Sequence, residues 1–152
     1  MGLSEVVENG YILYGDTRAG KTTLGHLLSG GSLRGVKMNG EFMVQATTSK
    51  NKNAAIGNSM RSETLVPNKF PVHLKDKKQD YSLIDTPGYG DTNGILTIIA
   101  NGYYHYRLYS KVKNIKFIVC FDAAHLHNTY ADFIKTIMQW TSSFKDYLLV
   151  RK

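Results

Sequence analysis

Residues 15–22 read Gly15-Asp16-Thr17-Arg18-Ala19-Gly20-Lys21-Thr22, a run of the form Gly-x-x-x-x-Gly-Lys-Thr. The two glycines let the backbone curl so that successive N–H groups point into one concavity, which suits phosphate oxygens. A helix that starts at the end of the run adds its unpaired N–H groups and the positive end of its dipole. Chance produces such a run in under about 1% of chains of this size. The run therefore predicts a phosphate-binding loop between a strand and a helix.

The segments on either side of this run have the character that such a loop requires. Gly10–Tyr14 is a short apolar run that predicts a buried strand. Lys21–Leu28 carries leucines at helical spacing and is followed by two glycines, which predicts a helix that ends at about Leu28. In this arrangement Lys21 is expected to reach the terminal phosphates, and Thr22 to place its hydroxyl on Mg²⁺. The next residue, Thr23, belongs to the same predicted nucleotide site.

Further along the chain, apolar runs alternate with amphipathic stretches. The polar stretch Ser32–Pro67 is expected to hold one short strand, Glu41–Ala46, and a long loop from Thr47. The other predicted elements are strands Phe70–Leu74 and Tyr81–Ile84 joined by a turn at Asp76–Gln79, a helix at Asn93–Val112, a strand at Ile115–Phe121 and a helix at Asn128–Tyr147. This order predicts an α/β fold of three layers, with a mostly parallel sheet that contains one antiparallel hairpin.

The composition is that of a globular protein and is consistent with one domain over residues 1–152. Of the 152 residues, 42% are hydrophobic and 20% charged, and the formal net charge is +7. The basic residues are scattered, which argues against a specific nucleic-acid interface. Cys120 is the only cysteine, so a disulfide framework and a multi-cysteine zinc site are excluded within these residues. A lone thiol, expected here to be a small core residue, fits a reducing compartment, and we expect a cytoplasmic protein.

A phosphate loop also needs an acidic residue at the end of a neighbouring strand, to hold Mg²⁺ through water. Asp85 follows the predicted strand Tyr81–Ile84 and begins Asp-Thr-Pro-Gly, so Asp85 is the first candidate. Asp122 also follows an apolar strand and is the rival candidate. Gly88, at the end of the Asp-Thr-Pro-Gly run, is expected to offer its backbone N–H to the terminal phosphate.

Together, the Gly-x-x-x-x-Gly-Lys-Thr run and residues 85–91, Asp-Thr-Pro-Gly-Tyr-Gly-Asp, resemble the phosphate-loop GTPases of the septin, immunity-associated and chloroplast-import-receptor branch. The resemblance implies GTP or GDP and Mg²⁺ as ligands and slow GTP hydrolysis. It also implies a nucleotide-dependent switch whose first switch loop supplies a threonine to Mg²⁺. Thr64 is the candidate for that threonine and Ser62 the second choice, while residues 88–94 correspond to the second switch. A homodimer or a related G domain is the protein partner that the resemblance implies.

Two departures from this class bear on function. Tyr89 stands where many small GTPases have the glutamine that orients the attacking water, so we expect slow intrinsic turnover or a catalytic group from elsewhere. The guanine-reading pattern Asn/Thr-Lys-x-Asp is not found in the 152 residues, so the chain is expected to be the N-terminal part of a G domain. An ATP-using phosphate-loop enzyme, or an assembly module with little turnover, therefore stays an alternative. An anionic membrane surface is a further alternative that no basic amphipathic helix supports.

Overall fold

The structure is a computed structural model of the chain. It describes residues 7–48, 54–56, 64, 66–73, 80–88 and 94–122, and in the C-terminal part residues 131, 133–135, 137–138 and 140–142. The chain divides into two compact units, Met1–Cys120 and Phe121–Lys152. All named strands and helices belong to the first unit: β1 Val7–Tyr14, α1 Lys21–Leu28, β2 Ser32–Met38, β3 Glu41–Thr48, β4 Asn68–His73, β5 Asp80–Asp85, α2 Ile95–Tyr109 and β6 Val112–Val119.

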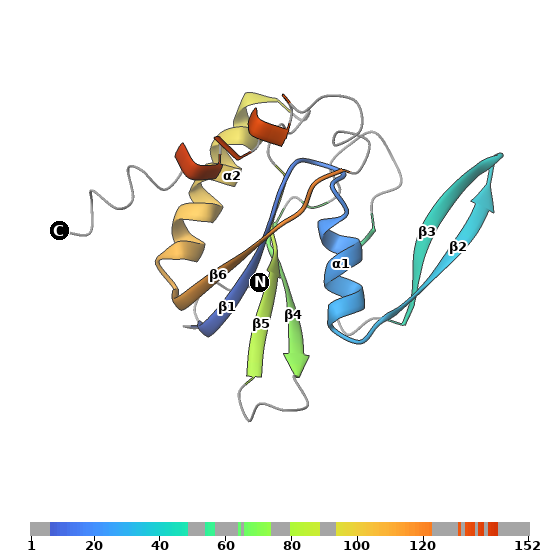
Figure 1. The fold of residues 1–152 in the computed structure, drawn as a ribbon, viewed down its shortest axis with the longest axis horizontal. Helices are drawn as coiled ribbons and strands as arrows, with labels where there is room; N and C mark the ends of the chain where they lie inside the picture. Colours follow the sequence, from blue (N-terminus) through green and yellow to red (C-terminus); the bar gives the residue numbers. More distant parts are fainter. Residues whose placement is uncertain are drawn as a thin grey trace. The chain divides into compact units, whose positions relative to one another are not determined.

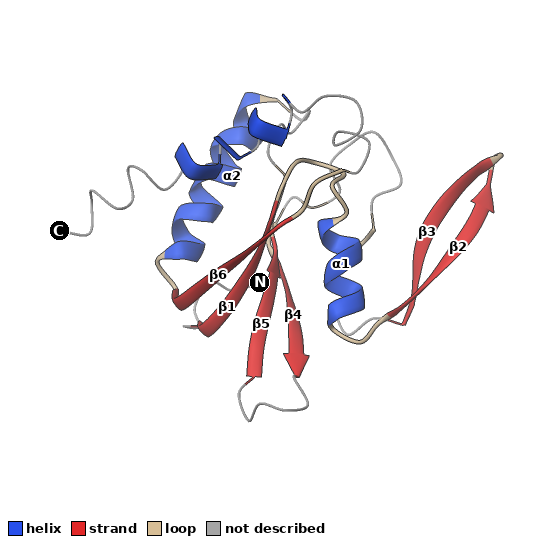
Figure 2. Ribbon diagram, viewed as in Figure 1, coloured by secondary structure: helices blue, strands red, loops and turns tan. Residues whose placement is uncertain are grey.

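Four strands form a mixed, mostly parallel sheet in the order β4-β5-β1-β6 (Figures 1 and 2). Strand β1 runs parallel to both β5 and β6, and β4 is antiparallel to β5. The chain crosses from β1 to β5 by way of α1, and then back past β1 to β6 by way of α2. Because crossovers between parallel strands are right-handed, these opposite directions place the two helices on opposite faces of the sheet. Figure 1 shows α1 and α2 on either side of it.

The register of the sheet decides which side chains face which helix. Leu13 of β1 is opposite Asp85 of β5, and Tyr11 is opposite Leu83. Side chains alternate between the two faces along a strand, so Leu13, Leu83 and Asp85 share one face. Leu13 and Leu83 lie in the buried cluster that also contains Phe70 and Cys120 and against which Leu24 of α1 packs. Asp85 is therefore directed to the α1 face, at the carboxyl end of the sheet.

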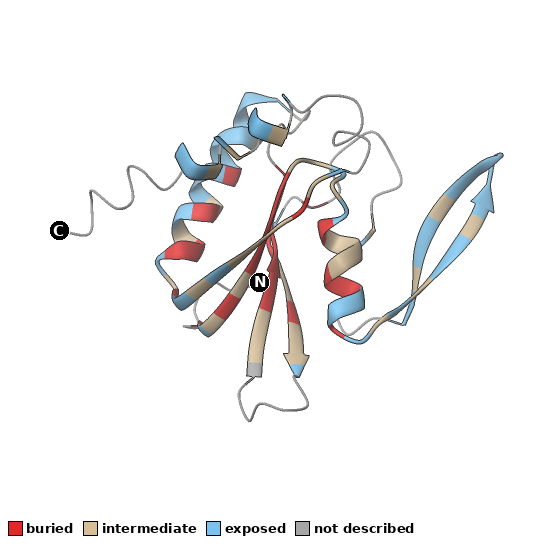
Figure 3. Ribbon diagram, in the orientation of Figure 1, coloured by how far each residue is buried: buried red, intermediate tan, exposed pale blue. Residues whose placement is uncertain are grey.

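The buried residues concentrate in the central strands, as Figure 3 shows. Ile12 and Ile84, which are paired across β1 and β5, are fully buried, and so are Leu13 and Phe70. The lone cysteine, Cys120, is buried in the core cluster, which confirms the prediction of a core residue. On the α2 side, Tyr109 packs its ring edge-on against Phe117 of β6, with ring centroids 5.9 Å apart.

Most of the predicted elements are confirmed, with shifted ends. The strand before the phosphate loop begins three residues earlier than predicted, and helix α1 has the predicted bounds. The helix predicted at 93–112 ends at Tyr109, because Val112 is already in β6 and pairs with Val7. The strand predicted at 115–121 is β6, which ends at Val119. In the second unit the described residues between 131 and 142 are helical, and the rings of Phe121 and Phe133 lie 4.8 Å apart.

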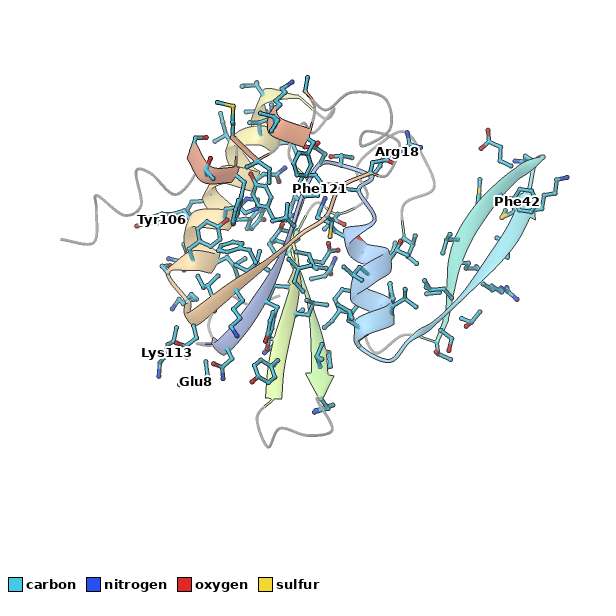
Figure 4. All side chains as sticks on the ribbon, viewed as in Figure 1. Glu8, Arg18, Phe42, Tyr106, Lys113 and Phe121 are labelled. Carbon is cyan, nitrogen blue, oxygen red and sulfur yellow. The ribbon has the colours of Figure 1, made fainter. Side chains whose placement is uncertain are left out.

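Residues 32–48 are more regular than predicted: the strand predicted at Glu41–Ala46 is confirmed as β3, but β2 was not predicted. These residues form an antiparallel hairpin of β2 and β3, separate from the main sheet. The turn is Asn39-Gly40, with φ values of 52° and 86°, the pair of positive φ angles that a two-residue hairpin turn requires. The ribbon is largely solvent-exposed, and Phe42 near its tip is 85% exposed (Figure 4). The turn at 76–79 and the loop residues 49–53 lie outside the described residues.

The tyrosines of α2 do not form one uniform packing face. Tyr109 is buried and Tyr104 is partly buried, whereas Tyr103 and Tyr106 are 58% and 64% exposed.

No helix within the described residues has both the length and the apolar character needed to cross a bilayer.

The connection between α1 and β2 gives a test of backbone packing. A Cβ atom on Gly31 would lie 2.7 Å from the carbonyl oxygens of both His26 and Thr48, and backbone oxygens cannot rotate away. We expect Gly31→Ala to lower the free energy of unfolding by about 1–3 kcal/mol. Gly35→Ala is the matched control, because a Cβ there meets nothing within 4 Å, and its effect should stay within about 0.5 kcal/mol. Urea unfolding midpoints measure both, and equal midpoints would contradict the expected backbone clash.

A second test concerns His105, which is buried on α2. Burial lowers the pKa of His105, although the carbonyl of Asn101, which accepts a 2.7 Å hydrogen bond from Nδ1, opposes that shift. Below the model-peptide pKa of 6.5 the unfolded chain therefore binds a proton that the folded chain does not. We expect stability to fall as pH drops from 6.5 toward the lowered pKa, by up to about 1.4 kcal/mol per pH unit. His105→Gln should flatten this acid limb in urea unfolding, whereas His73→Gln, at an exposed position, should leave it unchanged.

Candidate phosphate-binding site

The predicted phosphate loop, residues 15–22, lies at the carboxyl end of β1, where the backbone leaves the sheet in a tight curve. Gly15 has φ +148°, and a Cβ there would lie 2.2 Å from the carbonyl oxygen of Cys120. Arg18 and Gly20 have φ values of 73° and 80°, in the left-handed region. The first bond of helix α1 runs from the N–H of Leu24 to the carbonyl of Gly20 (2.9 Å). The predicted strand-loop-helix arrangement is thus present, with glycines at residues 15 and 20 and a left-handed backbone at Arg18.

Lys21 crosses back over the loop from the first turn of α1. Its side chain is buried, and Nζ donates hydrogen bonds to the carbonyl oxygens of Gly15 (2.8 Å) and Asp16 (2.6 Å). Burial lowers the pKa of Lys21, and the nearby charge of Asp85 opposes this shift. The ammonium group is therefore held at the loop by neutral carbonyls, which an anionic ligand could replace as stronger partners.

Three oxygen-bearing side chains from separate parts of the chain meet beside Lys21. The Thr22 hydroxyl donates to Asp85 Oδ2 at 2.7 Å, and the hydroxyls of Thr22 and Thr64 lie 3.2 Å apart. Thr64 Oγ1 is also 3.5 Å from Asp85 Oδ2. Asp85 is fully buried and Thr64 is 9% exposed. These are the three residues that sequence reasoning assigned to the metal, and α1, β5 and the β3–β4 connection bring them together.

The carboxylate of Asp85 is incompletely satisfied by the protein. Burial raises the pKa of Asp85, and the Thr22 hydrogen bond and the Lys21 charge oppose this shift. Within the described residues, Oδ1 of Asp85 is buried without a hydrogen-bond partner. A buried carboxylate oxygen of this kind is stabilised by a cation or by a water bound to a cation.

The donor set of this cluster fits Mg²⁺. Mg²⁺ prefers hard oxygen ligands and keeps several waters, so one carboxylate and one or two hydroxyls beside a phosphate site are sufficient. Among the described residues no group of three or more His, Cys, Asp or Glu side chains gathers.

The segment after β5 lies directly against the phosphate loop. The Thr86 hydroxyl donates to the Leu13 carbonyl (2.8 Å), which ties this segment to β1. A Cβ on Gly88 would lie 2.5 Å from both the backbone nitrogen and Oγ1 of Thr17, so only glycine allows this approach. Thr17 Oγ1 is itself buried without a hydrogen-bond partner in the described part of the chain. Gly88 is therefore close enough to the loop to share a ligand with it.

The remaining predicted site residues fall into three groups. Asp16, Ala19 and Thr23 lie in or directly after the loop, and Arg18 stands at its outer side, as Figure 4 shows. Asp122, the rival acid, belongs to the second unit. Ser62 and Tyr89 lie outside the described residues.

Sequence reasoning missed one residue near this site, His26. It lies one helical turn after Thr22 and is 1% exposed, and its ring donates a hydrogen bond to the carbonyl of Ala54. The i, i+4 spacing from Thr22 was the available signal, since it places both side chains on one face of α1.

Comparison of the chain with protein-family models, with curated proteins and with solved structures finds no match. What this site does is therefore inferred from its own side chains and backbone.

Proposed function

We propose that the chain binds a Mg²⁺-nucleoside triphosphate at this loop and acts as a GTP-dependent switch or assembly module with slow GTP hydrolysis. The observation that carries the proposal is the meeting of Thr22, Thr64 and Asp85 beside the buried ammonium group of Lys21. Such a cluster combines hard oxygen ligands for a metal with a cation for phosphate, at the positive end of a helix.

Each group has a role in this proposal. The loop N–H groups and Lys21 would bind the outer phosphates, and Thr22 and Asp85 would orient Mg²⁺ and its waters. When bound, Mg²⁺ would neutralise part of the charge of the outer phosphates. Thr64 already lies beside Thr22 and Asp85, and the terminal phosphate would add the contact that holds it there. Loss of that phosphate on hydrolysis would release Thr64, and this release is the proposed switch.

The choice of guanine rests on the resemblance of residues 15–22 and 85–91 to the septin-like GTPase branch. The ATP-using alternative shares the phosphate and metal chemistry and differs only at the base. The slow turnover rests on Tyr89, which lacks the carbonyl and amide with which a glutamine orients the attacking water.

A fluorescence titration with labelled GTP and labelled ATP, each in Mg²⁺ and in EDTA, tests the proposal. We expect tighter binding of GTP than of ATP, and weaker binding of both in EDTA. Equal or tighter ATP binding would favour the ATP-using alternative, and no binding by a folded chain would contradict nucleotide binding. Phosphate release at increasing protein concentration then separates a switch that turns over alone from a module that needs self-association.

A further inference from the structure

His26 lies next to the proposed nucleotide site, and none of the proposed roles involves its imidazole ring. His26 lies on α1 one turn after Thr22, and its side chain is 1% exposed. Its Nε2 atom is 2.8 Å from the carbonyl oxygen of Ala54. A carbonyl can only accept, so Nε2 carries the hydrogen and donates it.

Packing alone does not explain a histidine at this place. The ring of His26 meets Phe70 edge-on, with centroids 5.0 Å apart, a contact that an aliphatic side chain could replace. Within the described residues, Nδ1 of His26 is buried without a hydrogen-bond partner. A leucine would fill the space without leaving a buried nitrogen unsatisfied. What histidine adds is the hydrogen bond from Nε2 to Ala54, together with a weaker electrostatic effect that opposes the burial-driven rise in the pKa of Asp85.

That hydrogen bond fixes the connection that carries Thr64. Ala54 is 5% exposed and belongs to the core cluster with Leu13 and Phe70. Thr64 follows ten residues later in the same β3–β4 connection and meets Thr22 and Asp85. Helix α1 thus holds this connection at two points one turn apart, at His26 and at Thr22. Fixing the first point reduces the conformational entropy that is lost when the second one forms.

We infer that His26 is a positioning residue that keeps Thr64 ready for the Mg²⁺-triphosphate and so sets the preference for triphosphate over diphosphate. The inference rests on the proposed function, in which Thr64 responds to the terminal phosphate of the triphosphate. A diphosphate lacks that phosphate, so its binding does not depend on Thr64. Loss of the His26 donor should therefore weaken triphosphate binding and leave diphosphate binding nearly unchanged.

Three variants test this role. His26→Leu keeps the volume and removes the donor, and His26→Gln keeps an amide donor near the position of Nε2. Val112→Ala is the stability control, because Val112 is buried at the far end of the sheet, where it pairs with Val7. For each variant the dissociation constants of a non-hydrolysable GTP analogue and of GDP are measured with Mg²⁺. Amide hydrogen exchange at Thr64 is measured in the nucleotide-free chain.

We expect His26→Leu to reduce the triphosphate-to-diphosphate preference about three- to tenfold, the effect of one buried hydrogen bond, and to speed exchange at Thr64. His26→Gln should largely restore both the nucleotide preference and the slow exchange at Thr64. Val112→Ala should change neither the preference nor the exchange rate. An unchanged preference in folded His26→Leu would overturn the inference, as would equal loss of GDP and triphosphate affinity. If the unaltered chain binds no nucleotide, the proposed function is wrong. The exchange rates at Thr64 then decide separately whether His26 positions it.

Discussion

Lys21→Ala is expected to weaken the binding of Mg²⁺-triphosphate about ten- to a hundredfold, because one charge-assisted bond to phosphate, worth about 1.5–3 kcal/mol, is lost. In the structure Nζ is satisfied by two loop carbonyls, so the lysine is already held where the ligand would bind. The measurement is the dissociation constant of labelled GTP with Mg²⁺, taken beside circular dichroism to show that the variant folds.

Lys113→Ala is the matched control for this change. It removes the same charge from an exposed position on β6, where Lys113 pairs with Glu8 at the surface (Figure 4). An exposed ion pair contributes little to stability, so this variant should bind nucleotide like the unaltered chain. Unchanged affinity in a folded Lys21→Ala chain would contradict the phosphate-loop assignment. A loss of equal size in both variants would instead indicate a general effect of net charge.

Asp85→Asn is expected to remove most of the Mg²⁺ dependence of triphosphate binding. The amide keeps the shape of the carboxylate and an oxygen for the Thr22 hydroxyl, but it loses the charge that holds the metal and its waters. The affinity for Mg²⁺ should fall about ten- to a hundredfold, the range found when a group that orients metal-bound ligands is lost. The measurement is a Mg²⁺ titration at a fixed concentration of labelled GTP.

Asp122→Asn is the control for the Asp85 variant, since it removes one acidic charge from the rival candidate. Its Mg²⁺ titration should match that of the unaltered chain. The reverse result, a large loss of Mg²⁺ affinity in Asp122→Asn and none in Asp85→Asn, would assign the metal site to Asp122 and favour the ATP-using alternative. Comparable losses in both would contradict the assignment of the metal to Asp85 alone.

The parts of the structure that sequence patterns predicted well are those with strong local rules. Helix α1 has its predicted bounds because a glycine precedes it and two glycines follow it. Asp85 was placed correctly at a strand end, and parallel strands bring their carboxyl ends to one edge of the sheet. The position of Thr64 was harder to predict, because no periodic pattern places a threonine in a loop. Only the resemblance to the septin-like GTPase branch indicated it.

The parts that were missed depend on weak or distant signals. Strand β3 was predicted, but β2 and its pairing with β3 were not, because β2 is polar in composition; Asn39-Gly40 is a strong hairpin-turn signal that indicates this pairing. The helix predicted at 93–112 extends past the end of α2 because Val112 continues the apolar pattern of the helix. In the structure Val112 pairs with Val7 and belongs to β6. The spacing of His26 from Thr22 places both on one face of α1, but the hydrogen bond of His26 could not be predicted, because its partner is the backbone carbonyl of Ala54, 28 residues away.

Cys120 has a practical consequence for following this protein in solution. It is the only thiol of the chain, it is buried at the end of β6, and its backbone N–H bonds to Tyr14, directly before the phosphate loop. Burial raises the pKa of Cys120, so the thiolate that reacts with alkylating reagents is scarce in the closed protein. The time that a thiol reagent needs to modify it therefore reports the opening of the core cluster in which it packs with Leu13 and Phe70, with no label introduced. Any ligand that ties the loop to the sheet will lengthen that time.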